Sequence, residues 1–301
     1  MTTASTTRFA RAALQVLAAF VAWLAWTLRI RRRVVLDNLR LAFPEKAERE
    51  RRAIARATYR NLGRLAPEFL LAPRMTRDDL ERVFTYEGWE NFEEAQARGK
   101  GVIACTAHFG NFEMLAAVHN LKGIPITMIS RKMGRSRVND LWRRARARAG
   151  VEDLVVRKGE TLRAARRALE QGRVLGYVID QNQPLRRAIF PTFFGVPAAT
   201  SPTPAILALR TGAPVVFTLA LPLGDGRHRV LFEGPLEVPD TGDRRRDALA
   251  FMQDLNDRLE RRVREHPEHW YWLHRRWKTR PDGDVDARRG TPFIDRRGAA
   301  R

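Results

Sequence analysis

Short apolar runs alternate with segments of helical periodicity along most of this 301-residue chain. An apolar run of about four to eight residues rich in β-branched side chains predicts a buried strand, whereas apolar residues three and four positions apart predict an amphipathic helix. Because strands and helices alternate, we expect an α/β fold with a mixed central sheet flanked by helices. The expected strands are 101–107, 124–130, 174–179, 214–221 and 228–233, and the clearest expected helices are 47–71, 112 onward, 161–171, 200–211 and 243–265.

The first apolar segment is longer than a strand and holds no charge. Ala12–Leu28 is seventeen uncharged residues with Trp23 and Trp26, preceded by two arginines and followed by four. As a helix it measures about 25 Å, against a bilayer core of about 30 Å. We expect a membrane-anchoring helix that spans the bilayer or lies in its interface, with the heavier arginine cluster on the cytoplasmic side. A soluble core helix is the alternative, and the lack of a small-residue cleavage site disfavours a secretory signal.

The most informative stretch is 101–113, GVIACTAHFGNFE. Its apolar run ends at His108. Gly110 and Asn111 then offer a turn and a helix N-cap, and Glu113 falls in the first turn of the next helix. On one continuous helix, side chains five residues apart would point about 140° apart, so His108 and Glu113 can meet only because the chain turns between them. Catalytic groups of open α/β sheets cluster at such strand ends.

A histidine next to a carboxylate can act as a general base. The carboxylate holds one imidazole nitrogen and stabilises the imidazolium, which leaves the other nitrogen to accept a proton. Cys105 lies inside the apolar run and alternates away from His108, so we expect it to pack. We therefore expect His108 to deprotonate a substrate hydroxyl that attacks an activated acyl group directly. On the spacing alone, a structural histidine capped by Glu113 is an equally good interpretation.

A second polar cluster follows the strand expected at 174–179. Asp180 and Gln181 come directly after it, and in a parallel sheet they would lie near His108. Asp180 could bind substrate hydroxyls or support the site, and it could equally cap a loop. Arg131 also follows a strand, at the head of a basic segment. Residues 131–148 hold eight basic side chains and one acidic side chain, which favours an anionic surface or an acidic carrier over a merely solvated helix face.

The charge of the whole chain narrows the class of partner. The formal net charge is +21 at pH 7, which calls for nucleic acid, an anionic membrane or phosphorylated substrates. One cysteine excludes an internal disulfide framework. No Cys/His cluster has zinc spacing and no glycine-rich phosphate loop is present, so we expect no metal ion.

Several motifs in order resemble the lipid A biosynthesis (lauroyl/myristoyl) acyltransferase branch of the lysophospholipid acyltransferase superfamily, over roughly residues 10 to 280. The segment His-Phe-Gly-Asn-Phe-Glu, His108 to Glu113, is similar to the His-x4-Asp/Glu box of that superfamily. The other motifs are Asn38-Leu-Arg-Leu-Ala-Phe-Pro44, Arg131 after a strand, Asp180-Gln181, Phe193-Phe-Gly-Val-Pro197 and Trp270-Tyr-Trp-Leu-His-Arg-Arg-Trp-Lys278.

The resemblance implies a membrane-associated enzyme that transfers a fatty acyl chain to a hydroxyl of a lipid A precursor or related glycolipid. The acyl donor would be acyl-carrier protein or, second, acyl-CoA, with no other cofactor. His108 would be the base, Glu113 would orient it, and Arg131 would neutralise substrate phosphate. Backbone N–H groups around Gly110–Asn111 would stabilise the oxyanion, with Asp180 and Gln181 nearby as substrate-binding residues.

The resemblance also implies a cellular location. The expected location is the cytoplasmic face of the bacterial inner membrane, beside an anionic surface. The domains would be a tail and anchoring helix at 1–33, an acyltransferase domain at 34–280 and a disordered tail at 281–301.

Two further segments allow more than one interpretation. The basic and aromatic segment 267–278 suits single-stranded nucleic acid, a membrane interface, which the resemblance favours, or an amphipathic helix with its tryptophans in the core. The phenylalanine-rich loop 184–199 suits an acyl chain or a membrane contact, although part of it could be core.

Two other functions stay open at this point. One is a hydrolase that uses the same site with water as the acceptor. The other is a basic nucleic-acid-binding protein, which leaves the N-terminal apolar segment unexplained. The resemblance favours neither of them.

Overall fold

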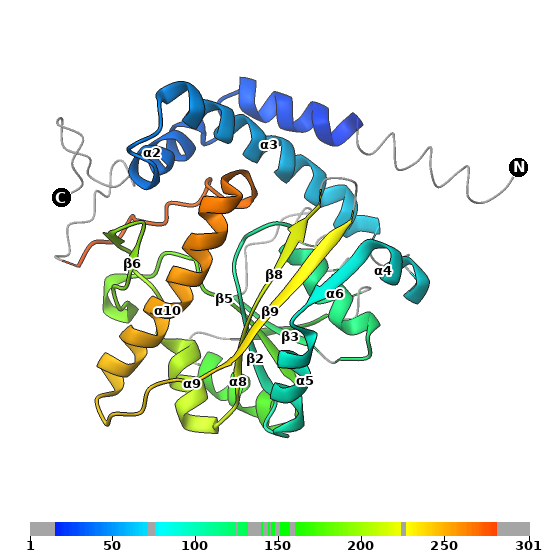
Figure 1. The fold of residues 1–301 in the computed structure, drawn as a ribbon, viewed down its shortest axis with the longest axis vertical. Coiled ribbons are helices and arrows are strands. Elements are labelled where there is room, and N and C mark those ends of the chain that lie inside the picture. Colours follow the sequence, from blue (N-terminus) through cyan, green and yellow to red (C-terminus); the bar gives the residue numbers. More distant parts are fainter. Residues whose placement is uncertain are drawn as a thin grey trace, which may run out of the picture.

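The computed structural model describes residues 16–281 apart from 72–75, 125, 132–139, 141–143, 145, 148–150, 157–159 and 224–226. It has an α/β fold whose seven-stranded sheet has the order β1-β9-β8-β2-β5-β3-β4 (Figure 1). The sheet consists of β1 (Phe84–Glu87), β2 (Val102–Thr106), β3 (Ile126–Arg131), β4 (Glu152–Val156), β5 (Val174–Val178), β8 (Val215–Pro222) and β9 (His228–Leu236), while β6 (Thr192–Phe193) and β7 (Val196–Pro197) pair separately.

The expected mixed sheet is confirmed. The strands from β8 through β2, β5 and β3 to β4 run parallel, β9 is antiparallel to β8, and β1 is parallel to β9. All five expected strands are present, whereas the expectation missed β1 and β4. The helices are α2 (Arg32–Ala42), α3 (Glu48–Leu71), α4 (Arg77–Val83), α5 (Trp89–Ala97), α6 (Phe112–Leu121), α8 (Thr161–Glu170), α9 (Thr203–Thr211) and α10 (Arg244–Glu265), with 3-10 turns η2 (Leu185–Arg187) and η3 (Pro267–His269).

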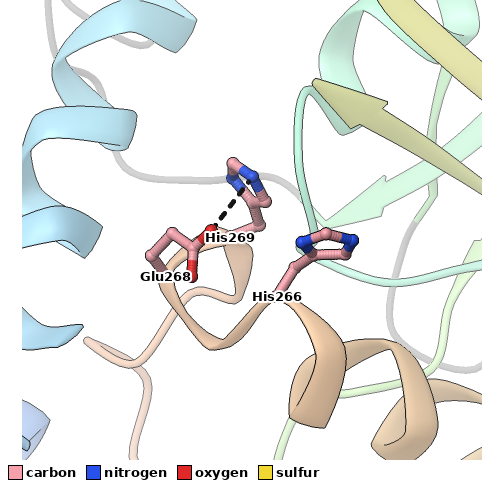
Figure 2. Close-up of side chains that lie close together, drawn as sticks. All are labelled: His266, Glu268 and His269. Carbon is pink, nitrogen blue, oxygen red and sulfur yellow. Dashed lines mark ion pairs between the residues drawn. The ribbon is translucent and has the colours of Figure 1, made fainter. Parts of the chain in front are cut away.

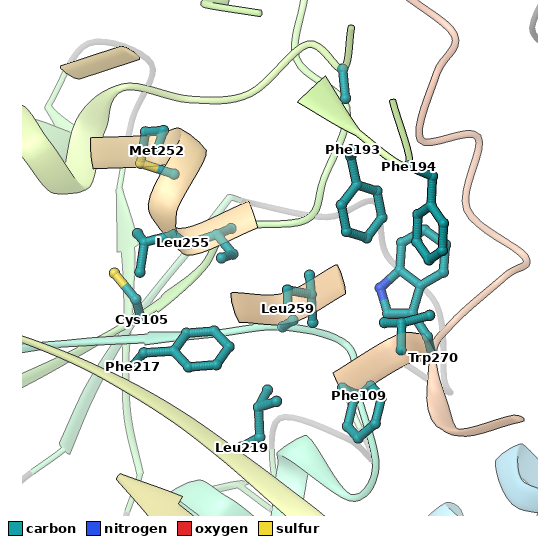
Figure 3. Close-up of a cluster of buried hydrophobic side chains, with 14 of the residues drawn as sticks. Cys105, Phe109, Phe193, Phe194, Phe217, Leu219, Met252, Leu255, Leu259 and Trp270 are labelled. Carbon is teal, nitrogen blue, oxygen red and sulfur yellow. The ribbon is translucent and has the colours of Figure 1, made fainter. Parts of the chain in front are cut away.

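The two faces of the sheet carry separate cores, because alternate residues of each strand point to opposite sides. On one face, Ile103 and Cys105 of β2 pack with the apolar sides of α8, α9 and α10. On the other face, Val102 and Ala104 pack with α5 and α6. Figure 3 shows the first core at the point where Leu255 and Leu259 of α10 approach β2 and β8. The strands that carry His108 and Asp180 are therefore fixed from both sides.

A helical layer lies across one end of the sheet, formed by α2, α3 and residues 16–27 (Figure 1). Ala18 and Ala22 of the N-terminal segment are buried and lie close to Gly63 of α3, so that a Cβ added to that glycine would lie 2.6 Å from the Ala18 carbonyl oxygen. The opposite side of this helix presents large apolar side chains to solvent, including Phe20 and Trp23 at 54% and 59% exposure. Its described part begins at residue 16, inside the predicted anchor.

In the described part of the chain, every helix is too short or too polar to cross a membrane. The prediction of a spanning helix is therefore not supported by this part of the chain. Residues 1–15 and the predicted tail after Pro281 lie outside the described residues, as does most of the basic segment 132–150.

The aromatic segments belong to the core. Trp270, Trp272 and Trp277 are buried, and the chain from η3 onward is irregular rather than an amphipathic helix. Phe193 and Phe194 are buried against these tryptophans, so the acyl-chain or membrane interpretation of that loop is wrong for both phenylalanines (Figure 3). Trp270 of this group pairs with Phe109 after β2 and donates its indole N–H to Asp180 after β5, so the aromatic core contacts the ends of both strands.

Candidate active site

The register of two parallel strands brings His108 and Asp180 together. Each residue of β2 pairs with the residue of β5 that lies 72 positions later in the chain, from Val102↔Val174 to Thr106↔Val178. His108 and Asp180 follow these strands at the same separation, because 180 − 108 = 72. The prediction that the two strand ends would meet is confirmed.

Asp180 holds His108 through two hydrogen bonds. Its Oδ1 lies 2.8 Å from His108 Nδ1, and its Oδ2 accepts the His108 backbone N–H at 3.0 Å. Oδ2 also accepts the indole Nε1–H of Trp270 at 2.8 Å. Burial would raise the pKa of the Asp180 carboxyl, but the charge of His108 and these hydrogen bonds outweigh burial and lower the pKa to about 2. Asp180 is thus an ionised, buried support for His108, and it does not present free oxygens to substrate hydroxyls.

The His108 ring keeps its other nitrogen toward the accessible side of the site. Its side chain is 19% exposed and lies between the rings of Phe112 and Tyr271, with centroids at 4.8 and 5.8 Å. Nε2 lies 3.4 Å from the side-chain Nε2 of Gln181, so Gln181 stands where a substrate hydroxyl would approach. Burial lowers the pKa of His108, but the charge and hydrogen bond of Asp180 oppose it and the net pKa is raised.

Glu113 does not occupy the place predicted for it. The partner of His108 Nδ1 is Asp180, and Glu113 instead forms a two-point ion pair with Arg146, with Oε2 to Nε at 2.8 Å and Oε1 to Nη2 at 2.5 Å. Glu113 still acts on the imidazole at a distance, since its charge contributes to the raised pKa of His108. The sequence pattern missed Arg146, which it placed on a basic surface rather than inside the site.

The predicted oxyanion donors are already engaged. The Gly110 N–H donates to the His269 carbonyl at 3.0 Å, and the Asn111 N–H donates to the Ala220 carbonyl at 3.2 Å. The Asn111 side-chain oxygen accepts from the Met114 N–H at 3.3 Å and so helps to cap α6, as its position predicted. Gly110 and Asn111 therefore shape the turn, and their N–H groups are not available to an oxyanion.

Arg131 is the last residue of β3, which pairs with β5 on the side away from β2. Its backbone therefore lies at the predicted sheet edge, and its side chain is outside the described part of the molecule. The carboxyl edge of β2 and β5 thus brings together the His108, Asp180 and Gln181 side chains.

The segment after η3 contacts both His108 and Asp180, a role that its sequence did not predict. The Tyr271 N–H donates to the His108 carbonyl at 3.0 Å, Phe109 bridges to Trp270, and Trp270 reaches Asp180. The signal in the sequence was the dense Trp-Tyr-Trp run, which predicted a nucleic-acid surface, a membrane interface or an amphipathic helix. Its tryptophans are instead buried in the core next to the residues that follow β2 and β5.

Cys105 cannot serve as a nucleophile in this arrangement. It is fully buried inside β2, and burial raises the pKa of its thiol. Among the side chains that the structure describes at this sheet edge, the geometry thus offers one candidate base, His108 Nε2, with the carboxylate of Asp180 on the other ring nitrogen. Such a site can take a proton from a hydroxyl while that hydroxyl attacks an acyl carbon.

One group of side chains in the described ranges has donor atoms close enough to hold a metal ion, and Figure 2 shows these side chains. It consists of His266, Glu268 and His269, with the chosen donor atoms within 4.8 Å of one another. Asn61 Nδ2 lies 3.0 Å from His269 Nδ1 and also donates to the Glu268 carbonyl, which favours a proton on His269 Nε2. That nitrogen faces the Glu268 carboxylate at 3.5 Å, so its N–H points at Glu268 and offers no lone pair to a metal ion.

Comparison with known proteins gives one consistent result. A family model described as bacterial lipid A biosynthesis acyltransferase matches residues 4–279. The chain is similar to the lipid A biosynthesis lauroyltransferase of Escherichia coli (strain K12), with 29% identity over 84% of this chain and 81% of the relative. It is also similar to the palmitoleoyltransferase of the same organism, with 26% identity over 85% and 82%, and to its myristoyltransferase, with 26% identity over 84% and 77%.

Proposed function

The chain belongs to the bacterial lipid A biosynthesis acyltransferase family, and from this premise we propose that it transfers a fatty acyl chain to a hydroxyl of a lipid A precursor with His108 as general base. The observation that carries the mechanism is the pairing of His108 Nδ1 with the buried, ionised Asp180, which leaves Nε2 as the proton acceptor. The relatives named above are lipid A acyltransferases, which supports the class of acceptor.

The proposed reaction is one direct displacement. The acceptor hydroxyl oxygen attacks the thioester carbonyl carbon while His108 Nε2 takes the hydroxyl proton. The C–S bond breaks, and the departing thiolate takes the proton back from the imidazolium. The charge of the tetrahedral intermediate would be stabilised by the positive N-terminal end of α6, which starts directly after Asn111.

Substrate charges suggest roles for the basic groups. Arg131, at the end of β3, is proposed to bind a phosphate of the acceptor, because guanidinium forms a two-point contact with phosphate. Gln181 is proposed to direct the acceptor hydroxyl, since its amide lies beside Nε2. Acyl-carrier protein is proposed as the donor, with acyl-CoA second. Both donors are anionic and suit the net charge of +21, which also suits an anionic membrane.

The N-terminal helix is proposed to lie in the cytoplasmic interface of the inner membrane. Its exposed side carries Phe20, Trp23 and four other large apolar residues between 16 and 27, and the chain then leads into the basic segment Arg29 to Arg33. An apolar face next to a basic cluster is the pattern of a helix that lies in the plane of an anionic membrane surface.

The substitution Phe20→Glu should weaken binding of the full chain to vesicles of phosphatidylcholine and phosphatidylglycerol by at least about tenfold, because an apolar ring is lost and a negative charge added. Leu249→Glu is the matched control, since Leu249 is an exposed apolar residue of α10. Co-sedimentation with the vesicles measures both. Equal binding of the two variants would remove the proposed membrane role of this helix.

Mass spectrometry of lipid A from a strain that lacks this gene tests the proposed function. We expect a lipid A population short of one acyl chain, restored by the wild-type gene and not by His108→Ala. An unchanged lipid A profile in the deletion strain would contradict the proposed acceptor.

A further inference from the structure

We infer that a row of arginines along α3 is a binding surface for the headgroups of anionic phospholipids, and that it holds the His108 end of the sheet against the membrane. This surface lies on a different element from the proposed apolar contact of the N-terminal helix, and its chemistry is that of charge rather than of apolar burial. The choice of a membrane as its partner rests on the proposed function.

Five exposed arginines share one side of α3. They recur every three or four residues, which places them on the same flank of a helix, and at 1.5 Å per residue the row is about 22 Å long. We call this row the arginine stripe, and it consists of Arg49, Arg52, Arg56, Arg60 and Arg64. Another side of α3, with Ala55, Thr58 and Tyr59, is buried. The stripe therefore presents positive charge to solvent while the helix stays packed.

The charge of the arginine stripe is almost uncompensated. Among the residues that the structure describes, an acidic side chain pairs with Arg52 alone, whose Nε lies 3.3 Å from Glu48 Oε1. Glu48 is shared with Arg40 of α2, at 2.8 Å. Like charges four residues apart on a helix repel one another and destabilise it. An anionic partner along the stripe would offset this repulsion.

Trp26 joins the arginine stripe to the N-terminal helix. The guanidinium carbons of Arg56 and Arg32 lie 5.6 and 5.1 Å from its ring centroid, and the ring packs edge-on against Tyr59 of α3 at 5.5 Å. The N-terminal helix lies beside α3 in Figure 1, and its outer side is apolar, as at Phe20. Tryptophan is enriched where apolar and charged groups meet at the headgroup level of a membrane.

The apolar neighbour decides between two anionic partners. An acidic carrier protein would meet the arginines but would leave the apolar side chains of residues 16–27 in water. A membrane that contains anionic lipids offers phosphate at its surface and hydrocarbon directly beneath it. One membrane surface therefore covers the stripe and the apolar side of the N-terminal helix together.

The helix that carries the stripe is tied to the end of the sheet where His108 lies. Asn61 of α3 donates to the Glu268 carbonyl at 3.0 Å, and the carbonyl of the next residue, His269, accepts the Gly110 N–H at 3.0 Å. Gly110 is two residues after His108. A membrane bound along α3 is thus at the same end of the sheet as His108, which is the end that a lipid acceptor must reach.

Co-sedimentation of the full chain with vesicles tests the surface. Replacement of Arg49, Arg60 and Arg64 together by glutamine should weaken binding to vesicles of phosphatidylcholine and phosphatidylglycerol in equal parts by about 10²-fold, because each basic residue near an anionic surface contributes about fivefold. Binding to vesicles of phosphatidylcholine alone should not change. Glutamine is a good helix former, so α3 should persist.

Three other exposed arginines provide a control with the same change in charge. Arg167 and Arg210 lie in the last turns of α8 and α9, which lead into the amino ends of β5 and β8. Arg245 lies in the first turn of α10, after β9, which is antiparallel to β8. All three are therefore near the opposite end of the sheet. Their joint replacement by glutamine should leave binding to both kinds of vesicle within about twofold of the wild type.

The lysine variant of the stripe separates charge from side-chain structure. Replacement of Arg49, Arg60 and Arg64 by lysine keeps the charge, so this variant should bind the mixed vesicles within about threefold of the wild type. Phe20→Glu separates the stripe from the N-terminal helix, since it should also weaken binding to phosphatidylcholine alone. The assay measures no acyl transfer, so its outcome does not depend on the proposed reaction.

Two results would overturn the inference. One is equal binding of the glutamine variant of the stripe and the control variant to the mixed vesicles. The other is a lysine variant that binds as weakly as the glutamine variant. If the glutamine variant kept its vesicle binding and instead raised the KM for an acyl-carrier-protein thioester, the stripe would be a docking surface for the carrier, and the membrane assignment would be wrong.

Discussion

Replacing His108 with alanine is expected to lower kcat for acyl transfer by at least about 10²-fold, the low end for removal of a general base. The fold should persist, because the side chain is partly exposed and lies at a strand end rather than in either core. His266→Ala is the control, since His266 is an exposed histidine at the C-terminal end of α10. Thermal unfolding of both variants separates a catalytic effect from a loss of structure.

The pH profile of the wild type belongs to the same prediction. Only the neutral imidazole can accept a proton, and the pKa of His108 is raised above 6.5. Activity should therefore fall as the pH drops through a value above 6.5, while Asp180, with a pKa lowered to about 2, stays ionised throughout. The acidic limb of kcat/KM against pH measures this value in the free enzyme. Near-normal turnover by His108→Ala, or an acidic limb well below pH 6, would remove His108 as the base.

Replacing Gly110 with alanine is expected to lower both the stability of the fold and kcat. Gly110 has φ of 55°, and a Cβ added there would lie 1.8 Å from the Ala220 carbonyl oxygen, which is backbone and cannot turn away. The turn must shift, so we expect the free energy of unfolding to fall by at least about 2 kcal/mol. Displacement of His108 by about 1 Å should also lower kcat by about 10²-fold.

Gly172 provides the matched control for this substitution. It has φ of 71°, and an added Cβ would meet no atom within 4 Å. Gly172→Ala should lower the free energy of unfolding by about 1 kcal/mol, the cost of the left-handed conformation alone, and should leave kcat unchanged. Denaturant unfolding and kcat are measured for both variants. Similar results for the two would show that the contact with Ala220 does not matter to the site.

Local pattern was enough to predict the elements that carry the site. The apolar run before His108 and the helical spacing after Asn111 predicted β2 and α6, because apolar runs, helical spacing and turn residues can be read from the sequence itself. The approach of Asp180 to His108 followed from a general rule, that parallel strands end at the same edge of a sheet.

Contacts between distant segments were not predictable in this way. The hydrogen bond from Trp270 to Asp180 and the ion pair of Arg146 with Glu113 depend on how separate elements pack, and no periodicity encodes them. The same holds for the N–H of Asn111, which is taken by Ala220 of β8. A spacing motif therefore located His108, the proposed base, but it assigned the wrong carboxylate to its ring nitrogen.

The central claim, acyl transfer rather than hydrolysis or nucleic-acid binding, is tested most directly by product analysis of the purified full-length protein in detergent. An acyl-carrier-protein thioester is incubated with and without a phosphorylated lipid A precursor, and lipid and free fatty acid are quantified by mass spectrometry. We expect the precursor to gain the mass of one acyl chain in the wild type, with His108→Ala inactive and free fatty acid a minor product when acceptor is present. Release of free fatty acid at the same rate with and without the precursor, and no acylated lipid, would contradict the account.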